Sequence, residues 1–217
     1  MLNKENVRTE MLAELMPFAD RYMRSMSYFR CAIMEVETKF RVISEDFNFR
    51  HDRNPIETVK SRLKSPESIR EKIKRKNLPL SIEALESNLY DVAGVRVICS
   101  FLDDVYALAE SFLGQDDVTL IERKDYIQNP KPNGYRSLHL IVEIPIFLFE
   151  EKKKMKVEIQ LRTIAMDFWA SLEHNMRYKK DELNISDEVR EELLSCATLS
   201  SMLDGRMNDL RQRILGE

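Results

Sequence analysis

Glycine and cysteine are scarce in this chain of 217 residues, which contains 5 glycines and 3 cysteines. Cys31, Cys99 and Cys196 are odd in number, lie far apart and form no Cys-x-x-Cys pair, which excludes a disulfide framework and a zinc knuckle. Their pattern fits reduced thiols. No GxxxxGKS or GxxxxGKT segment is present, so the sequence also excludes a Walker phosphate loop.

Long apolar runs are lacking as well. No stretch approaches the length of a transmembrane helix, and the first residues, MLNKENVRTE, lack an apolar signal segment. We therefore expect a soluble, cytoplasmic protein with no membrane partner. The net charge of -3 gives no general positive field, so no nucleic-acid partner is expected and any anion site must be a local cluster. The hydrophobic fraction of 43% suffices for one sizeable core.

Two apolar stripes with alternating spacings of three and four flank the centre of the chain, and each predicts a long helical arm. The N-terminal stripe comprises Leu12, Leu15, Ala19, Tyr22, Met26, Phe29, Ile33, Val36, Phe40 and Ile43. The C-terminal stripe comprises Val189, Leu193, Cys196, Ser200, Leu203, Met207, Leu210 and Ile214. We expect Pro17 to start a second helix, and Ser186 or Asp187 to cap the last one.

The two stripes have two interpretations. Helices laid on a central sheet are the favoured one, because most amphipathic helices cover a core. A subunit interface is the other, because two long seams exceed what a small sheet covers. We divide the chain into an N-terminal arm (1–50), a core (51–180) and a C-terminal helix (181–217).

The core alternates strands with helices, which predicts an α+β fold with a sheet flanked by helices. Strands are expected near residues 58–63, 95–100, 118–123, 137–144 and 155–162, and helices over 66–76, 103–113 and 165–178. In the last of these helices, Phe168, Trp169 and Leu172 are expected to pack onto the sheet.

The segment SRLKSPESIREKIKRK carries a cluster of cations. Ser65 and Pro66 mark a helix start, after which Ser68, Lys72 and Arg75 share one face near the positive end of the helix dipole. On the preceding strand, Arg62 and Lys64 point the same way. An anion site and a solvated lysine-rich face account for this segment equally well.

The segment DYIQNPKPNGYRSLH places Lys131, Tyr135, Arg136 and His139 on a loop stiffened by prolines. An aromatic ring among cationic donors is a suitable seat for a nucleobase and its phosphates. In VEIQLRT, Glu158, Gln160 and Arg162 share one face of a strand. Asp91 precedes an earlier strand, and two carboxylates sharing one divalent ion are usual in magnesium chemistry.

Five blocks in this order, RLKSPESIREK, YDVAGVRV, DYIQNPKPNGYRSLH, VEIQLRT and AMDFWASLEH, closely resemble the synthetase domain of the RelA/SpoT family. The resemblance covers roughly residues 54–180. The chain's short length is similar to that of small alarmone synthetases. Its segments NPIETVKSRLKS and NPKPNGYRSLH are more similar to the RelP branch than to RelQ. It implies a nucleotidyltransferase-like mixed sheet and a homotetramer built through the helical arms.

The resemblance also implies an activity, the transfer of pyrophosphate from ATP to the 3′-OH of GTP or GDP. Arg62 and Arg96 would flank adenine, and Asp91 and Glu158 would bind Mg²⁺, with Glu158 also acting as the general base. The phosphates of ATP would be held by four residues, Lys64, Ser68, Lys72 and Arg75.

For the acceptor, the resemblance implies that Tyr135 stacks on guanine and that Gln160 orients the ribose or a metal-bound water. Asp167 either reads the guanine edge or is simply a first-turn aspartate favoured by the helix dipole. The acceptor's 5′ phosphates would lie near Lys124, Lys131, Arg136 and His139.

Two other activities are alternatives to this one. A toxin-like relative would pyrophosphorylate tRNA 3′ ends, and a non-catalytic scaffold would lack one of the carboxylates. No hydrolase activity is expected, because the HD dipeptide at His51 and Asp52 has too few further ligands. The preference among GTP, GDP and GMP does not follow from the sequence.

Overall fold

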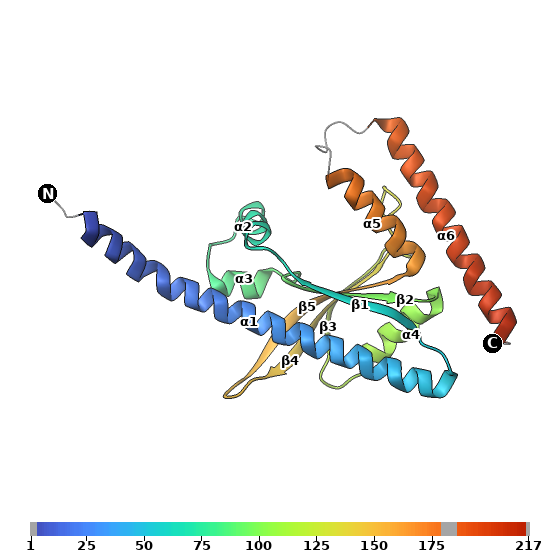
Figure 1. Ribbon diagram of the computed structural model, residues 1–217, viewed down its shortest axis with the longest axis horizontal. Helices are drawn as coiled ribbons and strands as arrows, with labels where there is room; N and C mark the ends of the chain where they lie inside the picture. Colours follow the sequence, from blue (N-terminus) through green and yellow to red (C-terminus); the bar gives the residue numbers. More distant parts are fainter. Residues whose placement is uncertain (1–3, 179–185, 216–217) are drawn as a thin grey trace.

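The computed structural model describes the backbone of residues 4–178 and 186–215 and the side chains within 19–176 and 186–214 (Figure 1). In chain order the elements are α1 (Lys4–His51), β1 (Ile56–Leu63), α2 (Pro66–Arg75), α3 (Ile82–Asn88), β2 (Ala93–Cys99), α4 (Leu102–Leu113), β3 (Thr119–Asp125), β4 (Leu138–Phe147), β5 (Lys152–Thr163), α5 (Ile164–Tyr178) and α6 (Asp187–Leu215). No helix within these ranges is long and apolar enough to cross a membrane.

The strands form one sheet in the order β1-β2-β5-β4-β3. Strands β2 and β5 are parallel, while the pairs β1–β2, β5–β4 and β4–β3 are antiparallel. The sheet is therefore mixed, and the predicted α+β fold is confirmed. The division into three segments stays a prediction, since helix α1 alone extends from the first arm to residue 51.

One face of the sheet is covered, and the other is open except where α5 lies against β2 and β5. Along β5, Val157, Ile159 and Leu161 are buried, whereas Glu158 and Gln160 between them are partly exposed. This alternation follows from the two-residue period of a strand. Helices α1 and α4 pack against the apolar face (Figure 1), and Phe40 of α1 stacks on Phe112 of α4 with ring centroids 4.7 Å apart. Polar side chains are thereby left on the opposite face.

Helix α1 confirms one sequence expectation and corrects another. Its predicted stripe is buried from Met26 to Phe40, where the helix crosses the sheet. The expected second helix starting at Pro17 is wrong, because α1 is continuous from Lys4 to His51. A proline removes one backbone hydrogen bond, and in a helix of 48 residues the turns on either side keep the helix continuous.

The apolar stripe of helix α6 does not face the sheet as the favoured interpretation predicted, but points away from it. Ser186 caps it, as expected, through its Oγ and the amide of Val189 at 3.4 Å. Its inward face is polar, because Asn208 and Arg211 both donate to Asp103 of α4. The apolar stripe instead faces outward, and Leu203 is 61% exposed. The expectation that this helix lies on the sheet is wrong for the described residues.

Helix α5 is also less buried than expected. Trp169 is buried, but it packs with Ala170 and Ala197 and donates from Nε1 to the carbonyl of Leu193 in α6 at 3.1 Å. Phe168 is 63% exposed and Leu172 is also exposed, so neither packs onto the sheet. The sequence also gave no sign of α3, which has seven residues, too few for a helical period to show.

Candidate active site

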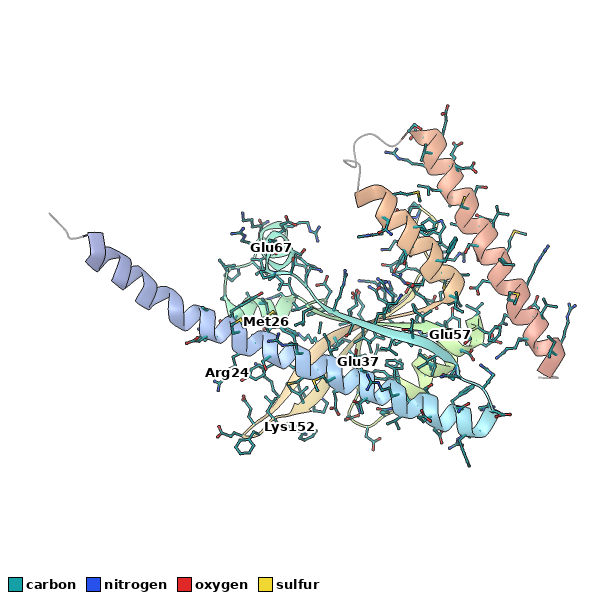
Figure 2. All side chains as sticks on the ribbon, viewed as in Figure 1. Arg24, Met26, Glu37, Glu57, Glu67 and Lys152 are labelled. Atoms are coloured by element: carbon teal, nitrogen blue, oxygen red, sulfur yellow. The ribbon has the colours of Figure 1, made fainter. Side chains whose placement is uncertain are left out.

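The open face of the sheet carries a cavity between β1, β2 and β5 that is partly open to solvent. In Figure 2, Glu57 lies toward one end of β1 and Glu67 marks helix α2 at the other end, with this face between them. Eight residues line the cavity: Lys60, Ser61, Arg62, Gly94, Val95, Arg96, Glu158 and Gln160. Four of the predicted site residues therefore meet here although they come from three different strands.

Arg62 and Arg96 line the cavity from neighbouring strands. The Arg62 side chain extends over Gly94, because a Cβ added to that glycine would lie 3.7 Å from Arg62 Cγ. Burial lowers the pKa of Arg96, and the charges of Arg162 and Arg62 lower it further, while Asp167 opposes the shift. Two guanidinium groups are thus held close together beside a cavity, which is a suitable arrangement for stacking on a planar base.

Two cations of the segment after β1 converge on one carboxylate. Lys64 Nζ lies 2.7 Å from Asp91 Oδ2, and Lys72 Nζ lies 2.5 Å from the same oxygen. Ser65 caps α2 as predicted, its Oγ accepting from the amide of Ser68 at 3.2 Å. A strand, a cap and a helix therefore focus positive charge at one point, which favours the anion-site interpretation over a solvated helix face. Arg75, by contrast, is exposed.

Asp91 is ionised in this setting. Burial raises the pKa of its carboxyl, but the hydrogen bonds and charges of Lys64 and Lys72 outweigh burial and leave the pKa below its ordinary value. Its second oxygen, Oδ1, is buried and has no hydrogen-bond partner. A buried carboxylate oxygen without a partner is costly unless a ligand satisfies it.

Glu158 shares the same part of the open face. The register pairs Glu158 with Gly94, three residues after Asp91. Burial raises the pKa of Glu158, and the charge of Asp91 adds to this, but His139 and Gln160 lower it below its ordinary value. The two carboxylates therefore lie close enough to interact, although they are far apart in the sequence.

The predicted acceptor loop packs under α5 and α6. Tyr135 is half-buried against Trp169 and Ala197, and Lys131 Nζ lies 4.7 Å from its ring centroid. Arg136 donates to the carbonyl of Ile127 at 2.8 Å. These contacts order the loop.

The remaining predicted residues lie on the strands around this loop and on α5. Lys124 on β3 is exposed and pairs with Glu122 at 2.9 Å. His139 Nε2 lies 2.8 Å from Tyr135 Oη, and Gln160 donates to Glu158 at 3.1 Å.

Asp167 is buried among cations. Its Oδ1 lies 3.3 Å from both Arg96 and Arg162, and its Oδ2 lies 3.4 Å from Lys60. Lys60 and Arg162 were not predicted as site residues. Strand alternation could have identified both residues. Lys60 shares a face of β1 with Arg62, and Arg162 shares a face of β5 with Glu158 and Gln160.

The described residues hold no cluster of three or more histidine, cysteine, aspartate or glutamate side chains able to bind a metal ion. A divalent ion bound here would therefore have Asp91 and Glu158 as its protein ligands and take its other oxygens elsewhere. Carboxylate oxygens without nitrogen or sulfur donors suit Mg²⁺, which keeps water or phosphate ligands. The partnerless Oδ1 of Asp91 fits such an ion.

Residues 61–183 match the family described as a region found in RelA / SpoT proteins. The chain is 40% identical over 201 residues to GTP pyrophosphokinase YwaC of Bacillus subtilis, covering 93% of this chain and 95% of that relative. It is 36% identical over 195 residues to GTP pyrophosphokinase YjbM of the same organism, covering 89% and 90%.

Solved structures agree with these relatives. The small alarmone synthetase 2 of Bacillus subtilis superposes with a TM-score of 0.80 at 41% identity, covering 88% of this chain and 98% of that one. The small alarmone synthetase 1 of the same organism, bound to its product pppGpp, gives a TM-score of 0.80 at 36% identity, with 89% and 97% covered. The family match over more than half of the chain and these relatives together show that the chain belongs to the RelA/SpoT family.

Proposed function

We propose that the protein is a GTP pyrophosphokinase that transfers the β,γ-pyrophosphate of ATP to the 3′-OH of GTP or GDP, giving AMP and (p)ppGpp. The observation that carries the proposal is that Glu158 lines one cavity with Arg62 and Arg96 and lies near enough to Asp91 for the two charges to interact. Relatives named GTP pyrophosphokinase, and a related structure bound to AMPCPP, support it.

The transfer forms a bond between the acceptor 3′-oxygen and the β-phosphorus of ATP and breaks the bond from that phosphorus to the oxygen that leaves with AMP. Glu158 takes the proton of the 3′-OH. The lowered pKa of Glu158 keeps it ionised near neutral pH, so it is ready to accept that proton. Its position on a strand holds it at a fixed place relative to the ATP cavity.

We assign Mg²⁺ to Asp91 and Glu158. When bound, the ion would neutralise the phosphoryl oxygens. Lys64 and Lys72 now pair with Asp91. When ATP binds, the two lysines would pair with its phosphates instead, and the Asp91 carboxylate would then be available to bind the metal ion. Ser68 and Arg75 lie on the same helix and would complete the phosphate contacts. Arg62 and Arg96 would hold the adenine by stacking.

The acceptor would bind beside the loop that carries Tyr135, with the aromatic ring against guanine. We assign the acceptor phosphates to Lys124, Lys131, Arg136 and His139, and the ribose to Gln160. Asp167 remains a candidate for the guanine edge, although its three cationic partners show that it also neutralises charge at the site. The RelP assignment stays a prediction.

We further propose self-association, with the homotetramer as the expected state. The outward faces of α5 and α6 carry large exposed apolar side chains: Ile164, Phe168, Leu172, Met176, Leu199, Leu203, Met207, Leu210 and Ile214. An apolar surface of this extent is typical of subunit contacts. A cytoplasmic location belongs to the same proposal, supported by the free thiols of Cys31, Cys99 and Cys196.

The test is chromatography of products after incubation of the protein with ATP and, in turn, GTP, GDP, GMP or deacylated tRNA. AMP and a 3′-pyrophosphorylated guanosine nucleotide are expected with GTP or GDP. Formation of ADP, or transfer of label from ATP to tRNA alone, would contradict the proposal and favour a different phosphotransferase.

A further inference from the structure

Both carboxylate oxygens of Glu158 face a nitrogen of a neighbouring side chain. Gln160 Nε2 lies 3.1 Å from Oε2, and His139 Nδ1 lies 3.5 Å from Oε1. Each of these neighbours can present either a donor or an acceptor, because an amide can flip and a histidine ring has two tautomers. The amide orientation of Gln160 and the tautomer of His139 must therefore be fixed by their other hydrogen-bond partners.

Arg162 fixes the amide orientation of Gln160. A guanidinium group carries donors and no acceptor. Arg162 Nη2 lies 3.0 Å from Gln160 Oε1, so the amide must turn its oxygen to Arg162 and its NH₂ group to Glu158. The opposite orientation would place two donors against each other and an oxygen against a carboxylate.

Arg162 also fixes the tautomer of His139, through the hydroxyl of Tyr135. Arg162 Nη2 lies 2.5 Å from Tyr135 Oη, so this oxygen accepts from the arginine. The phenol proton is then available to His139 Nε2, 2.8 Å away. With Nε2 accepting, the imidazole carries its own proton on Nδ1, which is the atom that faces Glu158.

Arg162 is itself fixed in place. It is 4% exposed, lies 3.3 Å from Asp167 Oδ1 and donates to Ser137 Oγ at 3.4 Å. Its guanidinium carbon also lies 5.0 Å from the centroid of the Tyr135 ring. A buried arginine with this many partners has little rotational freedom, so the direction of its N–H groups is set by the fold.

We propose that Arg162 is a positioning residue for the transfer reaction, fixing the direction of two chains of polar contacts to Glu158. One chain ends in the hydrogen bond from Gln160, and the other runs through Tyr135 to His139, whose Nδ1 approaches Glu158 at 3.5 Å. The inference rests on the proposed function, in which Glu158 accepts the 3′-OH proton. Arg162 does not line the ATP cavity, so it acts through its neighbours.

Two variants test this role by kinetics. Arg162→Lys keeps the charge but loses the planar group that reaches Gln160 and Tyr135 together, and Tyr135→Phe keeps the ring while removing the hydroxyl. Each is expected to lower kcat by about 10- to 100-fold, less than the loss of the general base itself, with KM for ATP within about twofold of wild type. Arg123→Lys, an exposed strand arginine paired with Glu110, is the matched control.

The double variant Arg162→Lys/Tyr135→Phe adds a second criterion. Since both changes break the same chain, the combined loss should be smaller than the product of the single losses. Multiplicative losses, or wild-type kcat in Tyr135→Phe, would overturn the proposal. If Arg162→Lys does not fold, Tyr135→Phe alone decides.

Nitrogen-15 NMR of the imidazole rings gives a readout independent of activity. His139, assigned with a His139→Asn variant, should show the Nδ1–H tautomer in the wild-type protein and a mixed or Nε2–H tautomer in Tyr135→Phe. An Nε2–H ring in the wild type would overturn the proposal. Failure of the proposed function looks different, because Glu158→Gln would then retain GTP-dependent AMP formation.

Discussion

At the scale of single residues, the site depends on where charge is buried and how it is balanced. Glu158 and Asp91 are both partly buried, yet the pKa of each lies below its ordinary value because cations or N–H donors outweigh the cost of burial. Asp204 of α6 is the opposite case. Burial raises the pKa of Asp204, and the hydrogen bond from Thr163 Oγ1 at 2.6 Å offsets only part of that.

Glu158→Gln is expected to lower kcat by about 10²- to 10⁴-fold, since it removes the proposed general base. Its Tm should stay within a few degrees of wild type, because glutamine fits the same space. Steady-state AMP formation and thermal denaturation measure the two effects. Glu143→Gln makes the same change on β4, where Glu143 pairs with Lys154 outside the cavity, and should keep wild-type kcat.

Asp204→Asn is expected to stabilise the fold near neutral pH. Because burial raises the folded-state pKa of Asp204 above the ordinary value of 3.8, the folded protein holds this proton more tightly than the unfolded chain. The group therefore favours folding below the unfolded pKa, and that contribution is lost as pH rises through the folded pKa. The Tm difference between variant and wild type should grow from pH 4 to pH 7. A constant difference would contradict the assignment.

At the scale of elements, α6 holds the loop that we propose binds the acceptor. Gly134 has φ of +87°, and a Cβ added to it would overlap Ala197 of α6. Trp169 ties α5 to α6 through the carbonyl of Leu193 and packs beside Tyr135. The C-terminal helix thus sets the position of a loop more than fifty residues earlier in the sequence.

Gly134→Ala is expected to displace this loop. Alanine at a positive φ costs about 1–2 kcal/mol, and the overlap with Ala197 adds to it. We expect KM for GTP to rise about tenfold while KM for ATP stays unchanged, because the cavity proposed to bind ATP lies between β1, β2 and β5.

Gly205→Ala is the matched control for this change. A Cβ at Gly205, in the interior of α6, has no neighbour within 4 Å, so alanine should stabilise the helix by about 0.5–1 kcal/mol and leave both KM values unchanged. Equal effects of the two changes on KM for GTP would show that α6 does not position the loop.

At the scale of the whole molecule, the exposed apolar faces of α5 and α6 need a partner surface. The inward face of α6 is occupied by a polar cluster around Asp103, which accepts from Asn208, Arg211 and Gln212. This cluster fixes the rotation of the helix, so the apolar stripe is turned outward. Self-association would bury it.

Leu203→Glu combined with Leu210→Glu is expected to dissociate the assembly into smaller species, because two charges in an apolar contact are poorly solvated. Size-exclusion chromatography with light scattering measures the mass. Leu120→Glu, a similar change at an exposed leucine of β3, should leave the mass unchanged. A monomeric wild-type protein at micromolar concentration would contradict the proposal.

The sequence by itself determined the features that depend on local periodicity and local chemistry. Alternation along β5 put Glu158 and Gln160 on one face, and Ser65 and Pro66 marked the start of α2, because strand pleating and helix capping act over a few residues. The family-like blocks supplied the candidate site residues, and the roles assigned to them stay predictions.

Only the tertiary structure decided the features that depend on contacts between distant elements. The outward turn of α6 follows from a polar cluster centred on Asp103, and Arg162 gains its directing role from Tyr135 and Asp167 in other elements. An apolar stripe has the same spacing whether it faces a sheet, solvent or another subunit. The direction of a hydrogen-bond chain depends on which side chains contact one another in the fold. Local sequence patterns do not show these contacts.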